Sequence, residues 1–101
     1  MTLRLGIIAE DKSDVDVVET LLRKISQKNF SVNYFAAKGS GKLRANARNW
    51  ARNLFSQGCN RLLVVHDLDH YSEKELKESL HASILECKIA VKSVIIPVRE
   101  V

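Results

Sequence analysis

Short apolar runs alternate with segments of helical periodicity along the whole of this chain of 101 residues. Short runs rich in aliphatic and β-branched side chains, bounded by loop residues or proline, are typical of strands. One of them, RLLVVH, is almost continuously apolar, as expected for a strand covered on both faces. The predicted strands are 3–9 (LRLGIIA), 31–37 (SVNYFAA), 61–66 (RLLVVH) and 90–98 (AVKSVIIPV).

Between the predicted strands, apolar side chains recur at the spacing of one helical face. They are Val15, Val18, Leu22 and Ile25 in the first segment, Leu43, Ala47, Trp50, Ala51 and Leu54 in the second, and Leu76, Leu80, Ile84 and Cys87 in the third. Ser13 is predicted to cap the first helix. Gly58 is predicted to end the second, which covers 43–55. Ser72 and Glu75 form an S-x-x-E capping box that predicts the start of the third.

This strict β-α-β-α-β-α-β order predicts a single α/β domain covering residues 1–101. Strands that alternate with helices form parallel sheets whose right-handed crossovers place helices on both faces. We therefore expect three layers, with three helices around a four-stranded parallel sheet in the common order 2-1-3-4. The hydrophobic fraction of 46% is ordinary for a globular domain.

Three acidic residues follow the two strands that this order makes neighbours. Glu10 follows the first predicted strand, and Asp67 and Asp69 follow the third within HDLDH. Ligands of open α/β sheets bind beyond the carboxyl ends of the strands, where these side chains would meet. Residues two apart in a strand share a face, so both aspartates could reach one cation, and Mg²⁺ prefers carboxylate oxygens. The pattern predicts a Mg²⁺ site, which Mn²⁺ could also occupy.

Each of these residues also has a plainer interpretation. Acids after strands often serve as turn or cap residues, and Asp11 and Asp14 suit the start of a helix, whose dipole favours negative charge. Alternation along the strand puts His66 and His70 on the opposite face from the aspartates. Because zinc sites need converging nitrogen and sulfur ligands, we expect hydrogen-bonded or supporting histidines instead. His70 is the better placed of the two to support a site.

Two segments resemble the Toprim domain of topoisomerases, bacterial-type primases and OLD-family nucleases. The segment 7–22 (IIAEDKSDVDVVETLL) is similar to its first motif, a strand followed by Glu and an Asp that opens a helix. The segment 62–80 (LLVVHDLDHYSEKELKESL) is similar to its second, which carries D-x-D. The resemblance covers the whole chain and is greatest to small prokaryotic Toprim-like proteins. It implies a Rossmann-like fold and Mg²⁺-dependent phosphoryl transfer.

Carried over to this chain, the resemblance makes Glu10 the general acid/base or a metal ligand, and Asp67 and Asp69 ligands of Mg²⁺. Asp14, His70 and Glu100, which lies in the last segment PVREV, would support the site. The chain departs from the family where Asp11 replaces the usual Gly after the first Glu. The implied function is a nuclease-like phosphodiesterase. The alternative is a non-catalytic module that binds nucleic acid or protein within a larger protein or complex.

The net charge of +4 favours a polyanionic partner, DNA or RNA. Arg44, Arg48 and Arg52 lie at i, i+4 and i+8, which places them on one helix face. The basic loop 38–42 (KGSGK) precedes them. The alternative is a solvated helix face. The predicted nucleic-acid contacts are Lys12, Lys38, Lys42, Arg44, Arg48 and Arg52.

Location and assembly are less constrained. Cys59 and Cys87 lack metal-binding spacing and are expected to be packed thiols in a reducing compartment. No apolar run is long enough for a membrane span, and MTLRLGIIAEDKSD has no cleavage-site pattern, so we expect a cytoplasmic protein. The second or fourth predicted strand could form an exposed edge that pairs with another copy or a larger complex.

Overall fold

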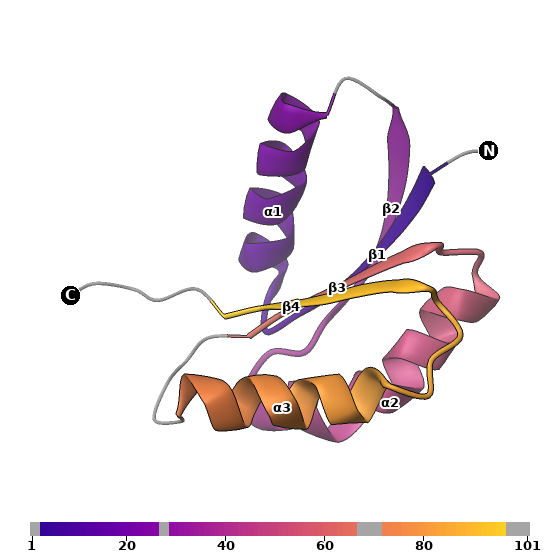
Figure 1. Cartoon of the computed structure of the whole chain (residues 1–101). Coiled ribbons are helices and arrows are strands. Elements are labelled where there is room, and N and C mark those ends of the chain that lie inside the picture. Colours follow the sequence, from indigo (N-terminus) through magenta and orange to yellow (C-terminus); the bar gives the residue numbers. More distant parts are fainter. Residues whose placement is uncertain (1–2, 27–28, 67–71, 97–101) are drawn as a thin grey trace.

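Four strands and three helices alternate without exception in the computed structural model, which describes residues 3–26, 29–66 and 72–96 (Figure 1). The order is the one that the sequence predicts. The elements are β1 (Leu3–Ala9), α1 (Lys12–Ile25), β2 (Phe30–Ala36), α2 (Ser40–Ser56), β3 (Arg61–Val65), α3 (Glu73–Ile84) and β4 (Val91–Ile95).

The strands form one parallel sheet in the order β2-β1-β3-β4, which confirms the predicted topology. β1 lies between β2 and β3, and its last residue, Ala9, is level with Ala36 on one side and Val65 on the other. The carboxyl ends of these three strands are therefore at the same height. Whatever follows them in sequence is brought to one edge of the sheet.

The core lies on both faces of the sheet, because alternate side chains of β1 and β3 point to opposite sides. Ile8 and Val64 pack with α2 and α3 on one face. Ile7 and Val65 pack with Val15 of α1 on the other. Figure 1 shows α1 on one side of the sheet and α2 with α3 on the other. The predicted three-layer arrangement is confirmed.

Gly6 of β1 allows α2 to approach the sheet closely. A Cβ at this position would lie 2.9 Å from Leu54 Cδ1 and 3.2 Å from Leu54 Cβ. Leu54 is fully buried. A larger residue at Gly6 would therefore push α2 away from the strand that carries Glu10 at its end.

The start of α2 differs from the prediction. The helix begins at Ser40, so the second half of the segment 38–42 is helical and only Lys38 and Gly39 precede it as loop residues. Both have positive φ, 58° for Lys38 and 138° for Gly39. The glycines suggested a longer loop, but Gly41 stands in the first turn of the helix, where the hydrogen bonds of its carbonyl group hold the backbone. Gly58 follows the end of α2 with a φ of 93°, as expected for a helix terminator.

The caps of the other helices also differ in part. Asp11, and not Ser13, is the N-cap of α1, and its carboxylate accepts a hydrogen bond of 3.1 Å from the Asp14 backbone N–H. Ser72 is the N-cap of α3 as predicted, but its side chain makes no capping hydrogen bond, so the capping box is incomplete. Ile25, which the helical spacing groups with Val15, is 77% exposed.

Both cysteines are buried free thiols, as the sequence predicts. Burial raises the pKa of the Cys59 thiol above its usual value, and nearby Arg4 opposes this in part. The helical spacing placed Cys87 on the third helix, but α3 ends at Ile84 and Cys87 follows it, with its Sγ 3.5 Å from the Ala51 carbonyl oxygen. Among the described helices, none combines the length and the apolar character that a membrane span requires.

Candidate functional site at the carboxyl edge of the sheet

The segments that leave β1 and β2 are tied together at the carboxyl edge of the sheet. The Ala37 backbone N–H donates a hydrogen bond of 2.9 Å to the Ala9 carbonyl oxygen. One step further on, the Gly39 N–H donates one of 3.2 Å to the Glu10 carbonyl oxygen. The N-terminal end of α2 is thereby held beside Glu10.

Glu10 and His66 occupy equivalent positions after the neighbouring strands β1 and β3. Glu10 Oε1 lies 3.7 Å from His66 Nδ1, which is an electrostatic contact longer than a hydrogen bond. The His66 side chain is fully buried, and 12% of the Glu10 side chain is exposed. The His66 backbone N–H donates a hydrogen bond of 3.1 Å to the Ile95 carbonyl oxygen, which extends the β3–β4 pairing by one residue. The carboxylate of Glu10 therefore points toward β3.

The other predicted metal ligands, Asp67 and Asp69, lie outside the described residues, as do His70 and Glu100. Asp67 is bonded directly to His66, whose side chain contacts Glu10. The carboxylate of Glu10 offers hard oxygen donors, which is the chemistry that Mg²⁺ prefers. Within residues 3–26, 29–66 and 72–96, no three His, Cys, Asp or Glu side chains are close enough together to hold a metal ion. Glu10 is the predicted ligand that the structure describes.

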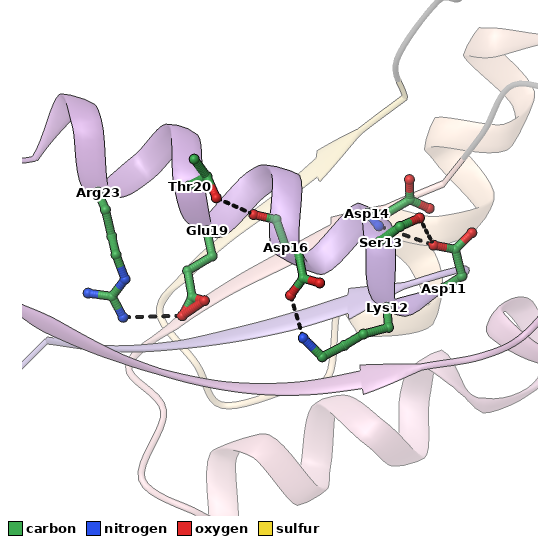
Figure 2. A network of polar contacts seen from close by, with 8 residues as sticks. All are labelled: Asp11, Lys12, Ser13, Asp14, Asp16, Glu19, Thr20 and Arg23. Atoms are coloured by element: carbon green, nitrogen blue, oxygen red, sulfur yellow. Dashed lines mark hydrogen bonds and ion pairs between the residues drawn. The ribbon is translucent and has the colours of Figure 1, made fainter.

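The first turn of α1 engages two of the polar residues that follow Glu10. Asp11 accepts hydrogen bonds from the Ser13 hydroxyl and from the Asp14 N–H (Figure 2). Its φ of −150° is ordinary extended backbone, so this position has no need of the glycine usual in the resembling motif. Asp14 is half-buried, on the side of α1 that borders a groove with Leu63 and Ile95. The Asp11 carboxylate thus caps the start of α1.

Lys12, predicted to contact nucleic acid, is engaged with its own helix and with β2. Its ammonium group pairs with Asp16 one turn along (Figure 2) and lies 4.9 Å from the centre of the Tyr34 ring. The hydrogen bond to Asp16 raises the pKa of Lys12, with burial opposing it. Lys12 therefore stays protonated, and Asp16 offsets its charge.

The predicted basic face of α2 divides into two parts. Arg48 is exposed, and none of the described residues forms an ion pair with it. Arg52, one turn further from the carboxyl edge, lies 3.7 Å from the Glu86 carboxylate beyond α3. Arg44 is half-buried, and Lys38 and Lys42 are exposed near the start of α2. The ion pair with Glu86 therefore lies toward the end of this face that is farther from the carboxyl edge.

His66 contacts Glu10, and the sequence analysis did not connect these two residues. Alternation along β3 indicates which face a side chain occupies but not which residue stands beside it on β1. The signal was available in the strand order, since Glu10 and His66 each come one residue after the paired positions Ala9 and Val65.

Comparison with models of protein families, with curated proteins and with solved structures gave no significant match.

Proposed function

We propose that this chain is a Toprim-like domain that carries out Mg²⁺-dependent phosphoryl transfer on nucleic acid, as a phosphodiesterase. The observation that carries the proposal is the contact between Glu10 and His66, 3.7 Å apart at the ends of adjacent strands. It supports the proposal because Asp67 is the next residue after His66, and Glu10 and Asp67 are two of the three acids of the motif. The strand order β2-β1-β3-β4 also supports it, because it makes β1 and β3 neighbours.

In this proposal Glu10 takes or donates the proton at the attacking or leaving oxygen, and it can also serve as a metal ligand. Asp67 and Asp69 would hold the ion. Bound Mg²⁺ supplies charge stabilisation at the phosphoryl oxygens. His66 packs against Glu10 and limits the directions that its carboxylate can take, since both side chains are largely buried.

The basic residues near the start of α2 are proposed to bind the phosphate backbone. Lys38, Lys42 and Arg48 are exposed. Such contacts position a nucleic acid without reading its sequence, so they suit an enzyme that acts on the backbone. DNA and RNA are both candidates, because each presents the same phosphodiester chemistry.

Cleavage assays on labelled single- and double-stranded DNA and RNA, with Mg²⁺ and with EDTA, test the proposal. We expect cleavage that needs the metal ion and that falls about 100-fold or more in Glu10→Gln, the scale of losing a proton-transfer group. Cleavage should also fall in Asp67→Asn, which would lose a charged ligand of the ion. Glu19→Gln is the matched control, because Glu19 pairs with Arg23 on α1, away from the carboxyl edge. Cleavage at wild-type rates in both site variants would contradict the proposal.

The second candidate is a non-catalytic module that binds nucleic acid or protein, alone or as part of a larger assembly. The exposed basic start of α2 favours it, because that surface can bind phosphates with no metal site. Salt-dependent binding of DNA or RNA without metal-stimulated cleavage would distinguish this function from the first. Absence of binding at low salt would contradict the nucleic-acid form of both.

A further inference from the structure

Among residues 3–26, 29–66 and 72–96, α1 is the helix that packs on one side of the sheet, and it lies mainly over β1 and β2. α2 and α3 together cover the opposite face (Figure 1). On the α1 side, Ile95 of β4 is 44% exposed although it pairs in register with the buried Val65. The exposed part of this face therefore lies at β4, beyond the buried Val65 of β3.

A groove of about 480 Å³ runs between α1 and the β3–β4 part of the sheet. Its floor is formed by Leu63, Val65 and Ile95. Of the described residues that line it, Asp14 is polar and the others are aliphatic. Grooves lined in this way bind apolar side chains.

The wall of the groove formed by α1 carries a stripe of exposed aliphatic residues. Val17, Leu21 and Ile25 recur at i, i+4 and i+8 and are 58%, 53% and 77% exposed. Contiguous exposed apolar surface of this kind marks interaction sites on soluble domains. An amphipathic helix that packed along α1 and over Ile95 would cover both the stripe and the groove.

We propose that the occupant is a second copy of this chain, with the two α1 helices packed antiparallel about a two-fold axis. The charges beside the stripe carry this choice. Asp14 stands in the first turn of α1 and Lys24 in the last, so the stripe is acidic at one end and basic at the other. Arg23, the other basic residue of the last turn, is already paired with Glu19. In a two-fold symmetric interface, the same surface of both copies meets in opposite directions. The acidic end of one stripe then faces the basic end of the other.

The sequence positions agree with a single register. An antiparallel pair that sets Val17 opposite Leu21 of the second copy also sets Asp14 opposite its Lys24. The same arrangement brings the C-terminal end of one α1 beside the N-terminal end of the other. Ile25 of the second copy would then lie near Asp14 and the exposed Ile95, which border the same groove. A single register thus pairs the aliphatic side chains of the two stripes with each other and pairs the acidic Asp14 with the basic Lys24.

The test is the mass of the chain in solution, measured by sedimentation equilibrium over a range of concentrations. We expect a dimer for the wild type and a dissociation constant raised about 30-fold or more in Leu21→Glu, the effect of losing a central anchor. Leu85→Glu is the control, because Leu85 is 72% exposed and lies outside the groove. A wild-type monomer at every concentration would overturn the proposal and leave the groove to a different partner. A dimer unaffected by Leu21→Glu would overturn it as well.

Charge exchange tests the proposed register separately. Asp14→Lys and Lys24→Asp should each weaken the dimer, because each puts like charges together, and the double variant should restore it. Far-UV circular dichroism spectra of each variant check that its helix content is unchanged. Two single variants as dimeric as the wild type, or a double variant weaker than both, would overturn the antiparallel arrangement. Neither measurement needs metal or nucleic acid, so its result is independent of the proposed phosphoryl transfer.

Discussion

Glu10 Oε1 lies 3.7 Å from His66 Nδ1, which joins the ends of two adjacent strands whose sequences are more than fifty residues apart. The contact is nearly closed to solvent, since His66 is fully buried and Glu10 is 12% exposed. Water therefore does little to screen it. The proposed site depends on this relationship, because it orients the carboxylate toward His66, which precedes Asp67 in the sequence.

The contact should be measurable as an energetic coupling. In a double-mutant cycle of Glu10→Gln and His66→Ala, we expect changes in the free energy of unfolding that differ from additivity by about 0.5–3 kcal/mol, as for residues in contact. Urea denaturation of the four proteins gives this value. A second cycle, of Glu19→Gln and His66→Ala, is the control. The effects of these two substitutions on the free energy of unfolding should be additive within about 0.5 kcal/mol. Equal coupling energies in both cycles would contradict a specific contact between Glu10 and His66.

Two glycines should respond in opposite directions to alanine. Gly6→Ala should lower the free energy of unfolding by about 1–3 kcal/mol, because the added Cβ meets Leu54 at 2.9 Å. Gly41→Ala should raise it by about 0.4–1 kcal/mol, since no atom lies within 4 Å of its Cβ position and the residue is already helical. Thermal unfolding of both variants beside the wild type checks the pair. A stabilised Gly6→Ala protein would mean that α2 does not press against β1 as described.

Stability should fall at alkaline pH, in part because of Cys59. Burial raises the pKa of this thiol, so the folded chain keeps a proton that the unfolded chain releases more readily. The contribution of Cys59 to the free energy of unfolding is complete below the ordinary thiol pKa of about 8.5. It is lost as the pH rises toward the pKa of the thiol in the folded chain. Urea unfolding of the wild type and Cys59→Ala at pH 7 and about pH 9.5 tests this. We expect a smaller loss between the two pH values in the variant, and an equal loss would contradict the prediction.

Arg48 should contribute to phosphate binding, and Arg61 should not. Arg48 is exposed on α2 with no ion pair to any described residue, whereas Arg61 starts β3 at the opposite edge of the sheet. Affinity for a labelled oligonucleotide measured at several salt concentrations separates them. A plot of log affinity against log salt concentration has a negative slope. Arg48→Gln should make this slope shallower by about 0.9, the effect of losing one phosphate contact on duplex DNA. Arg61→Gln should leave it unchanged, and equal effects would point to charge alone.

The order and topology of the elements were predictable because hydrophobic period separates strands from helices, and parallel crossovers restrict the strand order. Local boundaries were harder. Gly39 and Gly41 suggested a loop, yet α2 begins between them, because a helix with many buried contacts tolerates glycine in its first turn. Asp11 took the capping role predicted for Ser13, since the chain turns into the helix directly after Glu10.

The candidate site was predictable only in part. Strand order places Glu10 at the correct edge, but the role of His66 depends on its neighbour in β1, which a pattern within one strand does not reveal. The pairing of Arg52 with Glu86 joins α2 to the segment that follows α3. Helical spacing identifies neighbours within one helix and is silent on partners outside it.

A crystal structure of the chain with Mn²⁺ in place of Mg²⁺ tests the central claim most directly, because the anomalous signal locates the ion without assumption. The proposed site predicts one ion at the carboxyl edge with carboxylate oxygens of Glu10 and of Asp67 or Asp69 in its coordination sphere, at distances near 2.1 Å. Ordered carboxylates with Mn²⁺ bound to none of the three would contradict it.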